Sequence, residues 1–525
     1  MANRRAARGT TRGATRSGAD DIGPATPMQR ILIANRGEIA VRIARACREL
    51  GLTPLAVYSE ADAAAPHVRA ADAAACVGPP PSRQSYLDID AVIGAARALG
   101  ADAVHPGYGF LAENADFARA VGAAGMTFIG PSAEAISVMG DKTRARRTVS
   151  AFGVPVVPAV EELPADASAA QQAADGLGYP LLIKAAAGGG GKGMRVVRTA
   201  GEFAAARAAA VREALAAFGD GRVFLERYFE RARHVEVQIL ADTHGATVHL
   251  GERECSVQRR HQKIIEETPS PGVSPALRAR LTGAAVAAAR SVDYASAGTV
   301  EFLVTDTGEP YFLEMNTRLQ VEHPITEWVT GVDLVQAQLR IAAGARLWLT
   351  QDAIIARGHA IECRVYAEDP AQHFLPSAGR IALLREPQGA GVRVDSGLCA
   401  GGEVTVHYDP MLAKLSVWAA DREAARQRLL AALRDYAVVG VTTNIPFLID
   451  VLRHPEFAAG ATHTHFIDEH LRDWQPDLAD AELAAIAAAL HAVLAPAAVV
   501  GNGPRRRAAS PWQTLGGWRL GGGVR

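Results

Sequence analysis

A segment near residue 320 carries side chains that could bind a metal ion and an anion. It reads EMNTRLQVEHP from Glu314 to Pro324. Because alternate residues of an extended strand share one face, an extended conformation would point five polar side chains the same way: Glu314, Asn316, Arg318, Gln320 and Glu322. A solvent-exposed strand could show the same pattern, so the chemistry depends on what lies beside this segment.

The strand expected just before this segment supplies a neighbour for it. The apolar runs at 302–304 and 311–313 predict a hairpin that brings Glu301 beside Glu314. Two carboxylates and the amide oxygen of Asn316 are hard ligands that suit Mg²⁺ bound to nucleotide phosphates. Arg318 would then be placed to hold an oxyanion with two parallel hydrogen bonds.

A glycine-rich loop, KAAAGGGGKGMR from Lys184 to Arg195, follows a predicted strand. Glycine has no Cβ atom, so backbone N–H groups in such a loop can approach a phosphate closely. Lys184 and Lys192 add positive charge at either side of it. The spacing is not that of a Walker A loop, and no helix pattern follows. A flexible linker or a hairpin turn is the alternative, but the flanking lysines favour a loop that covers phosphate.

A second dense polar run, RECSVQRRHQK, spans residues 253–263. It contains no interleaved aromatic residues, which argues against a nucleic-acid surface. The sequence that follows it, IIEE at 264–267, is typical of a buried strand with acidic residues at its end. We therefore expect this run to line an anion-binding cavity.

The elements that must position these groups alternate in type along the first part of the chain. Strands are predicted at 31–34, 55–58 and 103–105 and helices at 37–50 and 89–99, which is typical of a doubly wound α/β unit. The layout is Rossmann-like, but the G-x-G-x-x-G motif is absent after the first strand, so no dinucleotide site is expected. Later strand patterns lie at 181–183, 195–197, 223–225, from 234 to 323 and from 358 to 420, and later helices at 333–344, 421–434 and 445–453.

Composition excludes several classes of protein. The chain has 525 residues and a formal net charge of −1, which argues against a polyanionic partner such as DNA. Five widely spaced cysteines without a C-x-x-C pair predict neither a disulfide framework nor a zinc site and suit a reducing cytosol. The apolar stretch 481–500 contains polar residues and a proline, so an amphipathic helix followed by a break is expected rather than a membrane span. Residues 1–29 are expected to form a disordered basic tail, with an organellar transit peptide as the alternative.

Several motifs, taken together and in order, resemble those of biotin carboxylases, which are ATP-grasp enzymes. The motifs are MGDKTRAR, IKAAAGGGGKGMRVV, RHVEVQIL, GERECSVQRRHQKIIEE, EMNTRLQVEHPITE, ILIANRGEIAVRI, HPGYGFLAEN, GHAIECRVYAEDP and FLPSAGRI. The resemblance covers about residues 30–473 and implies a fold of mixed α/β and α+β class. Its expected parts are a Rossmann-like (pre-ATP-grasp) domain at 30–141, an ATP-grasp domain at 142–345 with a mobile Gly-rich lid at about 154–226, a C-terminal biotin carboxylase domain at 346–473 and a tail at 474–525.

The resemblance also implies roles for individual residues. Contacts with ATP would come from Lys142, Lys184, Gly190, Gly191, the adenine-lining stretch from Glu226 to Phe229, His234 and His261. The ligands of Mg²⁺, with Mn²⁺ as an alternative ion, would be Glu301, Glu314 and Asn316. Bicarbonate would be held by Lys263, Arg318 and the backbone of Val321, with Glu322 as general base, and Arg364 would meet the ureido group of biotin.

The reaction implied by the resemblance is ATP-dependent carboxylation of biotin by bicarbonate through carboxyphosphate, the first half-reaction of an acyl-CoA carboxylase. No Met-Lys-Met-like acceptor motif is present, so the biotin is expected on a separate biotin carboxyl carrier protein. A carboxyltransferase subunit is a further expected partner, the expected assembly is a cytoplasmic homodimer, and no nucleic acid or membrane is expected. The segment SPWQTLGGWRL at 510–520 resembles the start of the region that follows biotin carboxylase in longer α-subunits, which favours a shortened or split α-subunit over an unrelated tail.

Two other functions remain open from the residues alone. Another ATP-grasp ligase would share the lid and the metal-binding face but should lack the RRHQK and ECR motifs. A catalytically silent subunit that binds ATP or bicarbonate would keep the fold, although intact Lys263, Arg318 and Glu322 argue against it. The final carboxyl acceptor cannot be read from the sequence, because acetyl-, propionyl- and methylcrotonyl-CoA and pyruvate all share this half-reaction.

Overall fold

The computed structural model describes residues 28–186, 194–477, 486 and 489–490. The chain divides into two units, Met1–Gln475 and Pro476–Arg525, and the fold below is that of the first unit. Several expectations lie outside the described residues: the basic tail through residue 27, Gly190 and Gly191 of the glycine loop, most of the helix at 481–500 and the segment 510–520.

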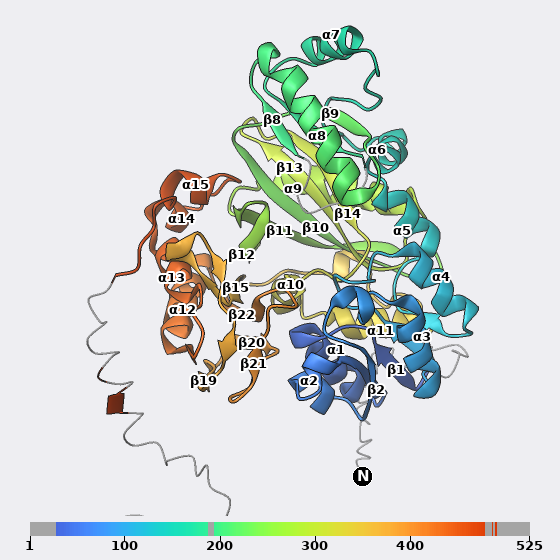
Figure 1. Cartoon of the computed structure of the whole chain (residues 1–525), viewed down its shortest axis with the longest axis vertical. Coiled ribbons are helices and arrows are strands. Elements are labelled where there is room, and N and C mark those ends of the chain that lie inside the picture. The colour runs from blue at the N-terminus through green and yellow to red at the C-terminus, as the bar shows by residue number, and fades with distance from the viewer. Residues whose placement is uncertain (1–27, 187–193, 478–485, 487–488, 491–525) are drawn as a thin grey trace, which may run out of the picture. The chain divides into compact units, whose positions relative to one another are not determined.

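A parallel sheet lies at the start of the chain, in the part coloured blue in Figure 1. Its order is β3-β2-β1-β4-β5, formed by β1 (Arg30–Ile33), β2 (Thr53–Ser59), β3 (Ala73–Gly78), β4 (Ala103–His105) and β5 (Thr127–Phe128). The helices between these strands are α1 (Gly37–Glu49), α2 (Pro66–Arg69), α3 (Ile89–Ala98) and α4 (Ala115–Ala123). Three consecutive residues of β1, Ile31 to Ile33, are at most 1% exposed, as a parallel strand covered on both faces requires. The predicted α/β unit is confirmed.

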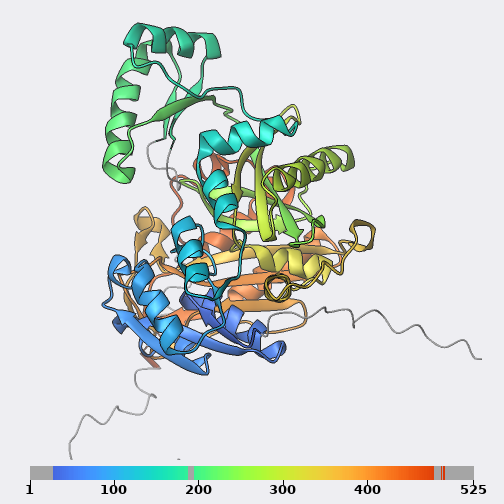
Figure 2. The ribbon, with the colours of Figure 1, turned by 90° about the vertical axis from the view of Figure 1, so that its right-hand side faces the viewer.

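A second, four-stranded sheet has the order β6-β9-β7-β8 and is preceded by α5 (Ala133–Gly140) and α6 (Lys142–Ala151). It comprises β6 (Ala159–Val160), β7 (Leu181–Ala185), β8 (Arg195–Val197) and β9 (Val223–Arg227). Helices α7 (Ala167–Leu177) and α8 (Phe203–Phe218) pack on it around a separate apolar cluster that includes Ile183, Phe203 and Leu225. We call this sheet and these two helices the lid; Figures 1 and 2 show its elements grouped at one end of the unit.

The largest sheet has eight strands in the order β14-β13-β10-β11-β12-β15-β22-β20, and all its neighbours are antiparallel. The strands are β10 (Ala232–Ala241), β11 (Thr247–Arg259), β12 (Gln262–Thr268), β13 (Ser296–Thr305), β14 (Pro310–Asn316), β15 (His359–Tyr366), β20 (Val392–Ser396) and β22 (Met411–Ala419). Along β10, Val235, Val237 and Ile239 pack into the core under α9 (Pro275–Arg290). The residues between them, Glu236 and Gln238, belong to the opposite face.

The remaining helices are α10 (His323–Thr330), α11 (Leu334–Ala342), α12 (Arg422–Asp435), α13 (Ile445–Arg453), α14 (Pro455–Ala458) and α15 (Phe466–His470). Short ribbons β16 (Glu368–Asp369), β17 (Leu375–Pro376), β18 (Gly379–Arg380), β19 (Leu383–Arg385), β21 (Glu403–Val404) and β23 (Ala437–Val439) complete the unit. The helices predicted at 333–344, 421–434 and 445–453 are confirmed. Helix α9 was missed, because its alanine-rich sequence follows and precedes strand patterns.

The extended conformation predicted for 314–324 is wrong beyond Asn316, where β14 ends. Residues 317–322 form a loop, and Glu322 is the N-cap residue of α10. Proline lacks a backbone N–H and fits the first turn of a helix, and Pro324 stands in that turn. No helix among the described residues is long and apolar enough to cross a membrane, and all five cysteines are free thiols.

Candidate active site

The predicted hairpin is formed by β13 and β14, and it pairs Glu301 directly with Glu314. The Glu301 Oε1 atom accepts hydrogen bonds from Asn316 Nδ2 at 2.9 Å and from Gln320 Nε2 at 3.2 Å. The Glu314 side chain, on the strand β14, has no hydrogen-bond or ion-pair partner among the residues that the structure describes. Burial and the neighbouring Glu301 carboxylate raise the pKa of Glu314.

This acidic pair fits a bound magnesium ion. Two carboxylates and the Asn316 amide supply the oxygen donors that Mg²⁺ prefers. A divalent cation would also relieve the repulsion that raises the pKa of Glu314.

Lys263 on β12 lies at the centre of a cluster of three carboxylates. Its Nζ atom is 2.5 Å from Glu236 Oε2, 2.7 Å from Glu301 Oε1 and 2.8 Å from Glu322 Oε1. These three acids come from β10, β13 and the start of α10. Burial alone would lower the pKa of Lys263, but the three carboxylates raise it well above its usual value. The residue is therefore a permanent cation.

Glu322 is fully buried and binds two cations. Oε1 accepts from Lys263, and Oε2 accepts from Arg364 Nη2 at 3.1 Å. Burial would raise the pKa of Glu322, but Lys263, Arg364 and Arg253 together hold it well below its usual range. The side chain is thus ionised, and its basicity is low as long as both cations remain bound to it.

The turn that carries Val321 and Glu322 is held from the sheet beneath it. Lys414 on β22 donates to the Val321 carbonyl at 2.8 Å, and Arg364 on β15 binds Glu322. Lys414 and Arg364 are cross-strand partners, so one pair of cations fixes two consecutive residues of the turn.

Arg318 follows the end of β14 and binds back to the metal-binding face. Its Nη2 atom donates to Asn316 Oδ1 at 2.9 Å, and its Nη1 atom donates to Gln320 Oε1 at 3.2 Å. Its Nε atom donates to Glu113 Oε2 at 2.8 Å. Arg318 therefore lies next to the carboxylate cluster although the strand does not continue to it.

Two lysines lie on the lid side of the site. Lys184 on β7 is 5% exposed and binds Glu226 Oε2 on β9 at 2.8 Å. Arg146 on α6 holds the other oxygen of Glu226 at 2.7 Å. Burial, and then the charge of Lys184, lower the pKa of Lys142 at the start of α6. Two neighbouring cations in a desolvated setting fit a bound polyphosphate.

The other predicted nucleotide contacts come from several different elements. His234 Nε2 on β10 is 2.9 Å from Glu301 Oε2. Desolvation, His465 and Lys184 lower the pKa of His261, which lies in the turn between β11 and β12. Phe229, beyond the end of β9, stacks on Tyr311 with ring centroids 5.4 Å apart.

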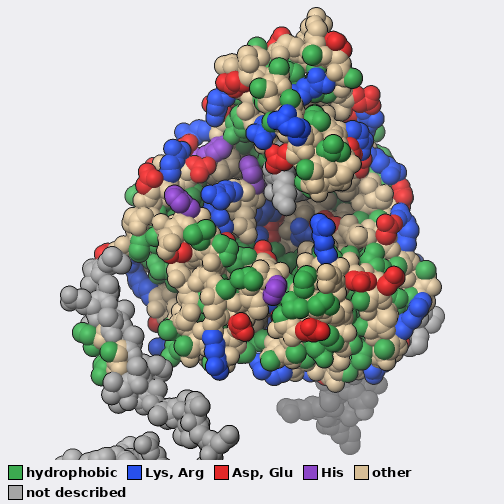
Figure 3. Space-filling view, in the orientation of Figure 1, with side chains coloured by type: hydrophobic (Ala, Val, Ile, Leu, Met, Phe, Trp, Pro, Cys, Tyr) green, Lys and Arg blue, Asp and Glu red, His purple; other side chains and the backbone are tan. Residues whose placement is uncertain are grey.

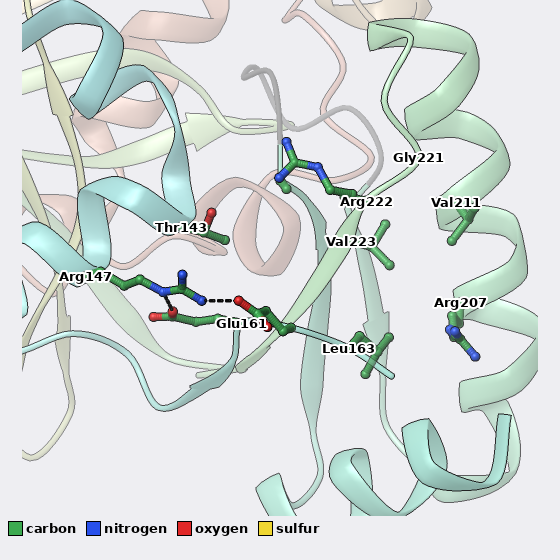
Figure 4. A pocket seen from close by; sticks show the side chains of 11 residues that line it. Thr143, Arg147, Glu161, Leu163, Arg207, Val211, Gly221, Arg222 and Val223 are labelled. Atoms are coloured by element: carbon green, nitrogen blue, oxygen red, sulfur yellow. Dashed lines mark hydrogen bonds and ion pairs between the residues drawn. The ribbon is translucent and has the colours of Figure 1, made fainter. Parts of the chain in front are cut away.

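Figure 3 shows a hollow between the lid and the rest of this face, with basic and acidic side chains inside it. A separate cavity of about 450 Å³ lies in the lid region, between α6, α8 and β9. Figure 4 shows the Arg147 side chain bound to Glu161 beside it. None of the predicted site residues that the structure describes lines this cavity, so it is distinct from the carboxylate cluster.

Sequence reasoning assigned no individual role to several residues of the site: Glu113, Glu236, Arg253, Glu266 and Lys414. Arg253 is fully buried and joins Glu236 at 2.5 Å to Gln238 at 2.7 Å. The polar alternation in RHVEVQIL could have identified Glu236, because Val235, Val237 and Ile239 make the other face of that stretch apolar. Glu113 lies in the HPGYGFLAEN motif, but nothing in its local sequence links it to Arg318.

Comparison with known proteins assigns the chain to a family. Three family profiles match in order: "Biotin carboxylase, N-terminal domain" at residues 27–136, "Carbamoyl-phosphate synthase L chain, ATP binding domain" at 141–350 and "Biotin carboxylase C-terminal domain" at 362–469. A biotin carboxylase of Nostoc sp. is 51% identical over 440 residues, which cover 84% of this chain and 98% of that protein. The chain belongs to the biotin carboxylase family.

Other members of the biotin carboxylase family serve different carboxylases. A pyruvate carboxylase component of Methanothermobacter thermautotrophicus is 51% identical over 84% of this chain and 90% of its own length. The biotin carboxylase domain dimer of Hydrogenobacter thermophilus 2-oxoglutarate carboxylase, solved with MgADP, ADP and bicarbonate, has a TM-score of 0.83 and 45% identity. The match covers 86% of this chain and 99% of that domain. These similarities confirm the recognised family and the predicted three-part biotin carboxylase fold.

Proposed function

We propose that this biotin carboxylase family member uses MgATP and bicarbonate to carboxylate biotin carried by a separate carrier protein. The observation that carries the proposal is the cluster in which Lys263 joins Glu236, Glu301 and Glu322. A buried cation beside a metal-binding acidic pair provides an anion site next to a phosphate site. Membership of the family supports biotin as the carboxyl acceptor of this step.

Bicarbonate would bind where Lys263 and Arg318 converge, with the backbone of Val321 as a third contact. Glu322 would accept the bicarbonate proton, and the resulting oxygen would form a bond to the γ-phosphorus as the bond to ADP breaks. Lys263 and Arg364 hold the pKa of Glu322 low, which makes Glu322 a weak base. These two cations must therefore bind substrate in place of Glu322 when Glu322 accepts the proton. The product is carboxyphosphate.

Lys142 and Lys184 would hold the ATP phosphates, assisted by the backbone of Gly190 and Gly191. The stretch from Glu226 to Phe229, with His234 and His261, would bind the nucleotide at the lid edge. Glu301, Glu314 and Asn316 would hold Mg²⁺, or Mn²⁺ in its place, which supplies charge neutralisation at the phosphates. Closure of the lid would exclude water from the reactive intermediate.

Carboxyphosphate would then break down to CO₂ and phosphate, and the phosphate would remove the N1 proton of biotin. Negative charge develops on the ureido oxygen of biotin as that proton leaves. The Arg364 guanidinium would stabilise that oxygen, and N1 would form its new bond to CO₂.

The assembly around this activity is also part of the proposal. We propose that the chain acts as a cytoplasmic homodimer with a biotin carboxyl carrier protein and a carboxyltransferase subunit. The dimeric biotin carboxylase domain of Hydrogenobacter thermophilus supports the proposed homodimer. The names of the related carboxylases give pyruvate and 2-oxoglutarate as their substrates, so the proposal covers more than one final carboxyl acceptor.

The decisive test is ATP hydrolysis by the purified protein with Mg²⁺, with and without bicarbonate and free biotin. We expect hydrolysis to depend on bicarbonate and to rise with biotin. Loss of a general base lowers a rate by about 10²- to 10⁴-fold, and Glu322→Gln should do so. Glu309→Gln, at an exposed ion pair with Arg280, is the matched control and should retain full activity. ATP binding without biotin-dependent turnover would refute the proposal and favour a different ATP-grasp substrate or a silent subunit.

A further inference from the structure

Arg364, the proposed contact of the biotin ureido group, lies between two buried carboxylates. Its Nε atom donates to Glu266 Oε1 at 2.6 Å, and its Nη2 atom donates to Glu322 Oε2 at 3.1 Å. Glu266 and Glu322 are both fully buried. Glu266 stands on β12 and Glu322 at the start of α10, so the guanidinium is held from two separate elements.

The two carboxylates have different roles in the proposed reaction. Glu322 would become neutral when it takes the bicarbonate proton, and a neutral acid holds a guanidinium less strongly than a carboxylate does. The contact of Arg364 with Glu266 is shorter than its contact with Glu322 and involves the Nε and Nη2 atoms. The Nη1 atom of Arg364 takes part in neither contact. Glu266 takes no part in the proton transfer, so it would stay hydrogen-bonded to Arg364 throughout the reaction.

Glu266 and its cross-strand neighbour Glu362 have no function in the chemistry described above. The second oxygen of Glu266, Oε2, is buried and has no hydrogen-bond partner among the described residues. Glu362 on β15 is the direct cross-strand partner of Glu266, and both Glu362 oxygens are likewise buried without a partner in the described part of the chain. Burial comes first among the effects that raise the pKa of Glu362 well above its usual value, which favours its neutral form. Ionised Glu266 is then the negative charge that faces Arg364 from this side.

We propose that Glu266 is a positioning residue of the biotin half of the reaction, which holds Arg364 in place when Glu322 releases it. Glu362, opposite it, would complete the arrangement as an uncharged neighbour that adds no competing negative charge. This inference rests on the proposed function, because it requires Arg364 to meet biotin. It predicts that the biotin step and the ATP step respond differently to loss of the Glu266 charge.

The ionisation of Glu266 offers an independent readout. Burial, opposed by Arg364, raises the pKa of Glu266 to about 7. The groups that face it are Glu362, Cys363, Arg364 and Tyr366 on β15, Lys263 on its own strand, Cys255 on β11 and Glu322 at the start of α10. Because the ionised form holds Arg364, the rate of biotin carboxylation should rise as the pH increases through about 7.

The experiment compares wild type, Glu266→Gln, Glu266→Asp and Glu267→Gln in the full chain. Glu267 is the matched control, because it is equally buried on the same strand and binds Arg422 and His359 instead of Arg364. Steady-state kinetics are measured for free biotin and for MgATP across about pH 6 to pH 9. Bicarbonate-dependent ATP hydrolysis without biotin is followed in parallel.

We expect Glu266→Gln to lower kcat/KM for biotin by about 10- to 100-fold, the loss expected for one charge-assisted hydrogen bond. The KM for MgATP and the biotin-independent hydrolysis should stay within about twofold of wild type. The rise through about pH 7 should disappear, and Glu266→Asp should restore part of it. Glu267→Gln should retain the pH profile of wild type.

Two results would overturn the inference alone. One is an equal loss in the biotin and MgATP parameters, which would make Glu266 a structural residue. The other is an unchanged kcat/KM for biotin in Glu266→Gln. A wild-type protein whose ATP hydrolysis does not respond to biotin would refute the proposed function itself, and that outcome is visible before any variant is measured.

Discussion

Removal of the Lys263 charge tests the electrostatic account of the site most directly. Lys263→Met keeps a long apolar side chain but leaves Glu236, Glu301 and Glu322 without their common cation. Each acid keeps another partner: Arg253 for Glu236 at 2.5 Å, His234 for Glu301 at 2.9 Å and Arg364 for Glu322 at 3.1 Å. We therefore expect a folded protein with a weakened site.

The size of the effect follows from these contacts. Breaking a buried ion pair by removing one partner costs about 3–5 kcal/mol. Because all three acids keep a partner, we expect the free energy of unfolding of Lys263→Met to fall by about 3 kcal/mol near pH 8. A domain has about 5–15 kcal/mol of stability, so this loss is large but not sufficient to unfold the chain.

The loss should depend on pH, with a sign that the structure determines. In wild type, Lys263 helps to hold the pKa values of Glu301 and Glu322 below their usual range. The stability that these two carboxylates contribute is therefore constant at pH values above their pKa values in the unfolded state, and it is lost only in strong acid. Without Lys263 these pKa values rise, so folding takes up protons and the variant gains stability as the pH falls. The difference from wild type should shrink between about pH 8 and about pH 6.

Denaturant unfolding at both pH values measures this difference, and Lys263→Arg serves as the control that keeps the charge. Bicarbonate-dependent ATP hydrolysis should be lost in Lys263→Met and partly kept in Lys263→Arg. A Lys263→Met protein within about 1 kcal/mol of wild type near pH 8 would refute the reasoning. A loss that is the same at both pH values would refute it too, because no carboxylate would then have gained a proton.

Two further predictions concern the metal and the lid. Glu314→Gln should raise the Mg²⁺ concentration for half-maximal ATP hydrolysis by about 10-fold or more, yet leave stability equal or higher, because burial and Glu301 raise the pKa of Glu314; a Mg²⁺ titration that overlays on wild type would contradict this. Arg146→Met removes a 2.7 Å ion pair with Glu226, so it should lower stability by about 3–5 kcal/mol and raise the KM for ATP. Thermal unfolding measures the stability and steady-state kinetics measure the KM for ATP. An unchanged KM would show that Arg146 has no effect on ATP binding at the lid.

The parts of the site that the sequence predicts are those with a local pattern. Two apolar runs predict the β13–β14 hairpin, and a register shift between Glu301 and Phe302 brings Glu301 opposite Glu314. The loop after Asn316 could not be predicted, because alternating polarity alone does not show where a strand ends. The structure then brings Arg318 back to Asn316 through a hydrogen bond and not through the strand.

The partners of Lys263 show a different limit. Glu236, Glu301 and Glu322 are 27, 38 and 59 residues away in the sequence. They come from β10, β13 and the start of α10, and β11 separates the two strands from β12 in the sheet. The meeting of these side chains therefore depends on sheet order and not on sequence spacing. Sequence reasoning therefore identified residue types correctly but could not state that one lysine binds three acids.

The antiparallel pairing of β12 with β15 has a consequence for how this protein can be divided. The predicted boundary at residue 345 falls between two strands that are hydrogen-bonded neighbours in one continuous sheet. A chimera that exchanges residues 346–473 would have to rebuild that strand edge and keep the pairing of Glu266 with Glu362 across it. The strands on either side of this boundary are thus best exchanged as one block, whereas the lid has its own small sheet and apolar cluster and is the natural part to exchange.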